Sequence, residues 1–217
     1  MKRLFSLLLA MLMLLPGCKA QGETKFSRNI FGYFDTVISL MGYTDSQEEF
    51  DRICDEVTDR LRYLHRLFDG YNSYPGVNNL WYVNRHAGSA PVQVDAPLFS
   101  LLKKAKDLQA TPGYEKVNIA MGSVLILWHN AREEGVLPSE SALEDARLHT
   151  DLSQVILDEE NSTVFFADPH IRLDLGAVAK GYVADCIKTL LQEKMPSFLI
   201  SLGGNVYAGE KPLDGRN

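Results

Sequence analysis

Apolar residues spaced three and four positions apart predict helices at several places along the chain. The clearest helix follows Ser46, which forms a capping-box pair with Glu49 and precedes an apolar series that ends at Leu67. A second helix opens at Pro97 and stops at the Thr-Pro-Gly sequence 111–113. Two further helices are expected at 124–129 and 141–149.

Alternating apolar and polar residues predict short strands between these helices. The expected strands are 30–42, 155–157, 163–167, 171–175 and 198–201. Residues 206–208 follow the turn at Gly203–Gly204 and lead only to a polar tail, so we expect a hairpin without a return strand and an unpaired sheet edge. Helices and strands alternate without a regular β-α-β period, which favours an α+β fold over a doubly wound parallel sheet.

The segment from Arg172 to Asp185 carries the strongest indication of a binding site. A strand that ends at Gly176 is followed by a helix that we expect to run from Ala177 to about Gln192. Backbone N–H groups at a helix start lack intrahelical partners and carry partial positive charge. Such a helix start therefore favours an anionic group such as phosphate.

The charged residues of this segment have the spacing of a small ligand site. Asp174, Ala177 and Lys180 lie three residues apart, so a carboxylate, a backbone carbonyl and an ammonium group could converge on one ligand. The alternative is that Asp174 caps the helix, that Lys180 is a solvated charge and that the glycines serve only the turn. Neither a Walker phosphate loop nor a Gly-x-Gly-x-x-Gly dinucleotide fingerprint occurs.

The first residues have the pattern of a bacterial export signal. Two basic residues precede an apolar run over 4–15, and Cys18 follows Pro16–Gly17 directly. We expect residues 1–17 to be a lipoprotein signal peptide rather than a membrane span, and Cys18 to be lipidated. Residues 18–217 would then form an exported protein, held by its lipid anchor at the cell surface or the periplasmic face of a membrane.

Net charge bears on the class of ligand. The chain has a formal net charge of −6, and loss of Lys2 and Arg3 with the signal peptide lowers it to −8. This balance argues against nucleic acid as a partner. An anionic ligand would need a local metal ion or a helix dipole to offset the field of the whole protein.

Two tyrosines and one histidine give a weaker indication of function. The loop 69–76 contains Tyr71 and Tyr74, which could pack on a planar ligand or be ordinary surface tyrosines. His129 has no histidine or cysteine at metal-ligand spacing, so we expect it to be an ordinary residue on a helix face.

Five short motifs follow one another along the chain. They are Phe34-Asp35-Thr36, Phe68-Asp69-Gly70-Tyr71 with Val83-Asn84 downstream, Val117 to Gly122 before Leu127-Trp128, Asp174 to Tyr182, and Leu202-Gly203-Gly204-Asn205. In type and order they resemble the ApbE family of FAD:protein FMN transferases, from about Phe31 to Gly209.

The resemblance implies a single ApbE-like (T-fold-like) α+β domain, incomplete at the C-terminus, that takes FAD as substrate and depends on Mg²⁺. The family moves FMN from FAD to a threonine or serine hydroxyl of an exported flavoprotein and releases AMP. By position, the resemblance assigns FAD contacts to Phe34, Tyr71, Lys116, Val117, Asn118, Asp174 and Lys180. It also assigns a magnesium-ligating backbone carbonyl to Ala177. Phe34-Asp35 stands where the family has Met-Gly, and Asn118 where aspartate is commoner.

The resemblance assigns no catalytic residue within this chain. The family's other metal ligands, a carboxylate and a threonine, and its catalytic segment are expected after Gly209, so we expect this chain alone to have little activity. Two alternatives stay open. One is hydrolysis of FAD by water, and the other is a flavin-binding surface lipoprotein that performs no chemistry.

Overall fold

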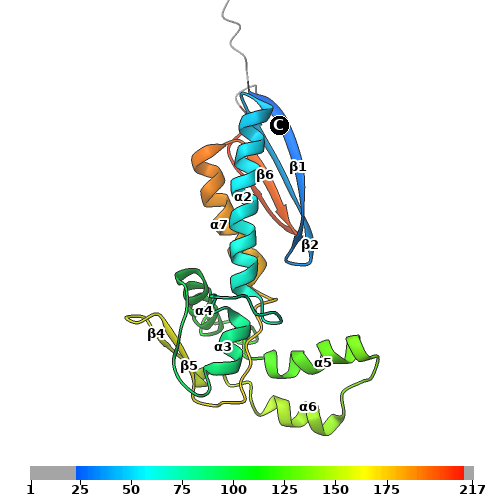
Figure 1. The fold of residues 1–217 in the computed structure, drawn as a ribbon, viewed down its shortest axis with the longest axis vertical. Helices are drawn as coiled ribbons and strands as arrows, with labels where there is room; N and C mark the ends of the chain where they lie inside the picture. The colour runs from blue at the N-terminus through cyan, green and yellow to red at the C-terminus, as the bar shows by residue number, and fades with distance from the viewer. Residues whose placement is uncertain (1–22, 213–217) are drawn as a thin grey trace, which may run out of the picture.

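The structure is a computed structural model that describes residues 23–212. The expected signal peptide (1–17) and Cys18 lie outside the described residues. None of the helices described is long and apolar enough to cross a membrane. The described part is an elongated α+β domain built around one long central helix (Figure 1).

A four-stranded antiparallel sheet forms one end of the domain. Its strands, in spatial order, are β1 (Thr24–Tyr33), β2 (Thr36–Thr44), β6 (Phe198–Leu202) and β7 (Asn205–Ala208). In the β2–β6 pairing Ile38 lies opposite Leu202, and both side chains are buried. The sheet thus joins segments from the two ends of the described chain.

Helices α2 (Gln47–Phe68) and α7 (Ala179–Lys194) lie side by side and contact this sheet (Figure 1). The Ser46 hydroxyl accepts the Glu49 amide at 3.2 Å, as its capping-box position predicts. The apolar face of α2 is buried at Phe50, Ile53, Cys54, Val57, Leu61, Leu64 and Leu67. Burial of one such side chain stabilises the fold by about 1.5–3 kcal/mol, so this face anchors the central helix.

The other end of the domain holds the remaining elements. They are α3 (Leu80–His86), α4 (Ala96–Gln109), α5 (Gly122–Glu134), α6 (Glu140–Arg147), a 3₁₀ turn (Leu152–Gln154), and a small antiparallel sheet of β3 (Val92–Gln93), β5 (Thr163–Phe166) and β4 (Val155–Asp158). Helices α5 and α6 form a hairpin that projects to one side (Figure 1). The α+β fold and the helices expected from periodicity are confirmed.

The early strand is two strands rather than one. A hairpin turn at Phe34–Asp35 divides the expected strand 30–42 into β1 and β2. Both turn residues have positive φ, 55° and 50°, the conformation that the tight turn of a twisted hairpin requires. Asn-Gly is the usual signal for this turn, so Phe-Asp gave no indication of it.

Two other strand expectations are corrected. Residues 171–175 are not a strand, because they have no strand partner and make a single parallel bridge between Met121 and Arg172. Their alternating burial arises instead from packing between α3 and the start of α5. The last hairpin does have a return strand, since β7 pairs with β6 through the turn at Gly203–Gly204, and β7 is the edge strand of the sheet.

Candidate functional site

A pocket of about 370 Å³ opens where the two ends of the domain meet. It lies between the β1–β2 turn, the end of α2, the loop after α2 and the start of α7. Its lining residues are Phe34, Asp35, His65, Phe68, Asp69, Gly70, Tyr71, Asn72, Leu80, Asp174, Leu175, Gly176, Ala179 and Lys180. Four residues assigned to FAD from the sequence, Phe34, Tyr71, Asp174 and Lys180, therefore share one pocket.

Phe34 is held in this pocket by His65 of α2. The Phe34 amide donates to Nδ1 of His65 at 3.3 Å, and the two rings meet edge to face with centroids 5.3 Å apart. Tyr33 also contacts this imidazole edge to face, with centroids 5.8 Å apart. His65 was not identified from the sequence, because its partners lie 31 positions away.

The loop after α2 is organised by Asp69. Its carboxylate accepts hydrogen bonds from the amides of Tyr71 and Asn72, from the Asn72 side chain and from the Tyr74 hydroxyl. Partial burial opposes the ionised form, but these hydrogen bonds outweigh it and hold the pKa of Asp69 below its usual value. The ionised Asp69 side chain thus holds the backbone of the loop through these hydrogen bonds, and so fixes the position of Tyr71.

Asn79 ties the same loop to α3. Its side chain is fully buried and donates to the carbonyls of Arg66, Asp69 and Asn72 at 2.8–3.1 Å. Its side-chain oxygen accepts the Tyr82 amide, so Asn79 is also the N-cap of α3. An asparagine before an apolar run is a helix-start signal, and it could have indicated α3 in the sequence.

Tyr71 stands at the edge of the pocket and contacts two other elements. Its ring stacks on His129 of α5, with centroids 4.4 Å apart, and its hydroxyl donates to Asp174 at 3.4 Å. Burial and the negative charge of Asp174 raise the pKa of Tyr71. His129 was expected to be an ordinary helix-face residue, but the structure places it against a predicted site residue.

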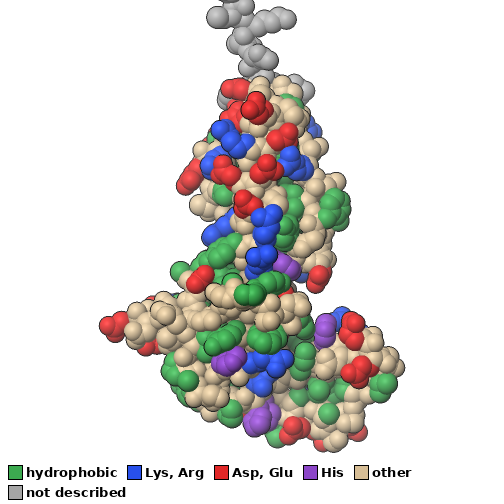
Figure 2. Space-filling view, viewed as in Figure 1, with side chains coloured by type: hydrophobic (Ala, Val, Ile, Leu, Met, Phe, Trp, Pro, Cys, Tyr) green, Lys and Arg blue, Asp and Glu red, His purple; other side chains and the backbone are tan. Residues whose placement is uncertain are grey.

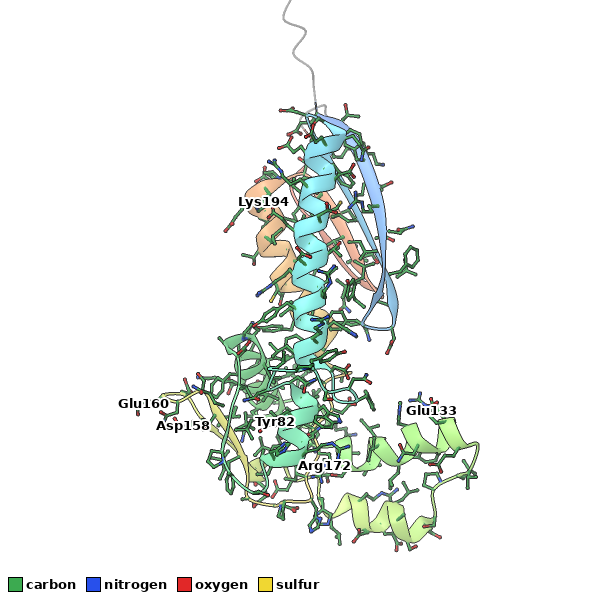
Figure 3. All side chains as sticks on the ribbon, viewed as in Figure 1. Tyr82, Glu133, Asp158, Glu160, Arg172 and Lys194 are labelled. Carbon is green, nitrogen blue, oxygen red and sulfur yellow. The ribbon has the colours of Figure 1, made fainter. Side chains whose placement is uncertain are left out.

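The backbone that carries Asp174 is clamped on both sides. Asn84 of α3 donates to the Leu173 carbonyl at 2.9 Å and accepts the Leu173 amide at 2.7 Å. The Asp174 amide donates to the Ile119 carbonyl at 2.8 Å. A single asparagine therefore takes the place of a neighbouring strand. Figure 3 labels Arg172, which directly precedes Leu173 in this segment.

Asp174 does not cap α7. Its Oδ1 accepts the amide of Gly176 at 2.8 Å, and α7 begins only at Ala179, with Val178 as an N-cap that makes no side-chain hydrogen bond. The expected helix start at Ala177 is therefore two residues early. The capping alternative is wrong, and the carboxylate faces the pocket instead.

Lys180 and Ala177 lie at the start of α7 but face different sides. Lys180 lines the pocket, is half-buried and forms no ion pair with any residue of 23–212. Ala177 lines a separate hollow of about 260 Å³ beside α4 and is not among the residues that line the pocket. The backbone hydrogen bonds of this turn end on the carbonyls of Leu175 and Val178, which leaves the Ala177 carbonyl between them available to a ligand.

Lys116, Val117 and Asn118 do not line the pocket. Asn118 shapes its own turn: its side-chain oxygen accepts the Ala120 amide at 2.8 Å, and its amide group donates to the Thr150 carbonyl at 2.7 Å. Lys116 is exposed and Val117 half-exposed. These three residues therefore lie outside the pocket lining, although the carbonyl of Ile119, the residue after Asn118, accepts the Asp174 amide.

The described residues supply only some of the ligands that a metal ion needs. Within the described region, no group of three or more His, Cys, Asp or Glu is arranged to hold a metal ion. The Asp174 carboxylate and the Ala177 carbonyl are oxygen donors of the kind that Mg²⁺ prefers, and Mg²⁺ commonly adds water and phosphate oxygens to one or two protein ligands. The donors present fit Mg²⁺ only together with a phosphate ligand.

The chain matches known proteins over most of its length. The model of the ApbE family matches residues 34–217. The FAD:protein FMN transferase of Klebsiella pneumoniae is 36% identical over 126 residues, which cover 58% of this chain and 40% of that protein. The FAD:protein FMN transferase of Treponema pallidum is 39% identical over 132 residues, which cover 58% of this chain and 36% of that protein.

Solved structures agree with the fold. The structure of the flavin transferase ApbE from Vibrio cholerae matches with a TM-score of 0.75 at 19% identity, over 89% of this chain and 62% of that chain. The structure of the ApbE protein from Thermotoga maritima matches with a TM-score of 0.73 at 21% identity, over 85% of this chain and 59% of that chain. The matched region thus spans less than two thirds of each of these proteins. The family match over residues 34–217, together with this fold, shows that the chain belongs to the ApbE family.

Proposed function

We propose that the pocket at the start of α7 binds FAD, and that the protein is a FAD:protein FMN transferase. The observation that carries the proposal is the convergence of Phe34, Tyr71, Asp174 and Lys180, from three separate parts of the chain, on one pocket. The names of the relatives support the same activity.

The two sides of the pocket suit the two kinds of group in FAD. Phe34, Phe68 and Leu80 offer apolar and aromatic surface for a planar ring. Lys180 offers an ammonium group that suits a pyrophosphate. The Ala179 amide already donates to the Leu175 carbonyl, so the backbone contribution comes from the N–H groups that follow it in the first turn of α7. Because the whole chain is acidic, this local positive end is what makes an anionic ligand favourable.

The proposed reaction is a phosphoryl transfer. The oxygen of an acceptor threonine or serine hydroxyl forms a bond to the FMN phosphorus, the bond from that phosphorus to the AMP oxygen breaks, and the hydroxyl proton passes to solvent or to a base. Lys180 and the α7 N-terminus would stabilise the negative charge that moves to the departing AMP. The Ala177 carbonyl, together with phosphate oxygens of the substrate, would hold Mg²⁺, whose charge would add to this stabilisation when it is bound.

The proposed place of action is outside the cytoplasmic membrane. The export signal over residues 1–17 and the following Cys18 would place the protein on a membrane surface, where its acceptor would be an exported flavoprotein. Incorporation of labelled palmitate that is lost in Cys18→Ser would support the lipid anchor. Equal labelling of both proteins would contradict it.

The activity is tested by incubating the 217-residue chain and a longer family member with FAD, Mg²⁺ and an exported flavoprotein as acceptor. Covalent flavin fluorescence on the acceptor supports transfer. Release of AMP and free FMN without labelling would instead show that water replaces the acceptor hydroxyl. If FAD does not raise the melting temperature of either protein, the proposed pocket is not a FAD site.

A further inference from the structure

A second pocket, of about 180 Å³, lies beside the first. Its lining residues are Gly70, Tyr71, Trp81, Asn84, Arg85, Gly122, Ile126, Arg172, Leu173 and Asp174. Gly70, Tyr71 and Asp174 line both pockets, so they form a shared wall. We call this second hollow the arginine pocket, after Arg85 and Arg172.

The two arginines bring positive charge to this pocket, and neither forms an ion pair with a carboxylate of residues 23–212. The Arg85 guanidinium lies over the Trp81 ring, 4.5 Å from its centroid. Arg172 donates through Nη1 to the carbonyls of Pro169 and Ile171 at 2.9 and 2.6 Å, both of which are neutral acceptors. Figure 2 shows basic side chains gathered on this face between α3 and the α5–α6 hairpin.

The carboxylates nearest to these arginines are already engaged. Asp168 accepts hydrogen bonds from His149 at 2.7 Å and from the His170 amide at 2.9 Å. Asp174 accepts the Gly176 amide at 2.8 Å and forms part of the shared wall. Burial of Arg172 and the positive charge of the exposed Arg85 lower the pKa of Arg172, and the negative charge of Asp168 offsets this shift only in part. An incoming anion would relieve this repulsion.

We infer that the arginine pocket binds an acidic side chain of the acceptor polypeptide, and so places the acceptor hydroxyl next to the phosphate end of the FAD pocket. This inference rests on the proposed function. The paired N–H groups of a guanidinium match the two oxygens of a carboxylate. Two guanidinium groups in one pocket favour an anion over a neutral ligand. In the proposed function the pyrophosphate of FAD binds at Ala179 and Lys180, which line the FAD pocket but not the arginine pocket.

The shared wall explains why an anion held there would position the acceptor. A chain whose acidic side chain occupies the arginine pocket can continue past Tyr71 and Asp174, which also border the FAD pocket. The nucleophilic hydroxyl would then approach from a fixed direction. Preorganised approach of this kind raises the rate of a two-substrate reaction.

The test measures peptide binding separately from FAD binding. Trp81 is one of two tryptophans, so Trp128→Phe makes its fluorescence a local reporter of the arginine pocket. The probes are short glycine and alanine peptides with one threonine and one aspartate at varied spacing, each with an asparagine counterpart. Inorganic phosphate and AMP are titrated in parallel, and FAD binding is followed by thermal shift.

The variants are Arg85→Gln and Arg172→Gln, with Arg85→Lys as the conservative change. Lys103→Gln, an exposed cation of α4 that pairs with Glu159, is the matched control for loss of one charge. Because Arg85 is exposed on α3, its replacement leaves the fold intact even if Arg172→Gln is destabilised.

The inference predicts that the best aspartate peptide binds roughly tenfold more weakly to Arg85→Gln. It also predicts that Arg85→Lys recovers part of the loss, and that Lys103→Gln and the asparagine peptides show no such change. FAD binding should differ by less than about twofold among these variants.

Equal binding of aspartate and asparagine peptides would overturn the inference. So would a matching loss of FAD and AMP affinity in Arg85→Gln, because the pocket would then serve the nucleotide. Absence of FAD binding to every protein would refute the proposed function instead, while the peptide result stands by itself.

Discussion

Replacement of Asn84 tests how the segment that carries Asp174 is held in place. The Asn84 side chain donates to the Leu173 carbonyl at 2.9 Å and accepts the Leu173 amide at 2.7 Å. Leu173 is 3% exposed, so water cannot readily replace either hydrogen bond. Asn84→Ala removes both bonds and leaves the buried N–H and C=O groups of Leu173 without these partners.

The expected loss of stability follows from these two bonds. A hydrogen bond contributes about 0.5–1.5 kcal/mol net, and a buried polar group left unsatisfied costs about 1–3 kcal/mol. We therefore expect Asn84→Ala to lower the free energy of unfolding by about 2–3 kcal/mol. For a domain of this size, that corresponds to a fall in Tm of roughly 4–12 °C. FAD affinity should fall as well, because Asp174 follows Leu173 directly.

Urea unfolding followed by circular dichroism measures the change, with Asn78→Ala as the control. Asn78 is exposed and makes one side-chain hydrogen bond, to the Gln93 carbonyl at 2.8 Å. Its replacement should change stability by no more than about 0.5 kcal/mol. If the two variants lose the same small amount, Asn84 does not clamp the segment and the reasoning is refuted.

Three further predictions concern the same site. Asp174→Asn should lower the pKa of Tyr71 towards its ordinary value, since it removes a negative charge next to the hydroxyl; ultraviolet absorbance against pH measures this, and an unchanged pKa would contradict the contact. The stability contributed by ionised Asp69 is present above its unfolded pKa of about 3.9 and is lost as pH falls through its lower folded pKa. Asp69→Asn should thus reduce stability at pH 7 and flatten its loss below about pH 4, and parallel acid-unfolding curves would argue against this role. Gly122→Ala should cost about 1–3 kcal/mol, because a methyl group there would lie 2.4 Å from the Arg172 carbonyl oxygen; a thermal melt like that of the native protein would show that the contact yields easily.

Local patterns predicted the helices well and the strands less well. Helix α2 has a capping pair and a buried face that runs for its whole length, so its period is unambiguous. Apolar and polar residues alternate over 171–175 as they do in a strand, but here the alternation reflects only which side chains are buried. Their hydrogen-bonding partner is the side chain of Asn84 rather than a strand, and no local pattern reveals a partner 89 positions away.

Some residues of the candidate site could likewise be predicted from local sequence, and others could not. The spacing of Asp174 and Lys180 indicated an anion site, because both belong to one turn and one helix start. The contacts of Tyr71 with His129 and Asp174 depend on how α5 packs against the loop after α2, so periodicity could not predict them. Arg172 was taken as the polar position of a strand, and its approach to Arg85 became visible only in the fold.

Direct titration of FAD into the protein tests the central claim, that the start of α7 holds the phosphate groups of FAD. Lys180→Gln removes the ammonium group that lines the pocket, and Lys188→Gln removes one charge from the same helix, where Lys188 lies against the ring of Tyr207. The account predicts that FAD binds Lys180→Gln about tenfold more weakly than the native chain, and that Lys188→Gln binds FAD as the native chain does. Equal affinity of the native chain and Lys180→Gln would contradict it.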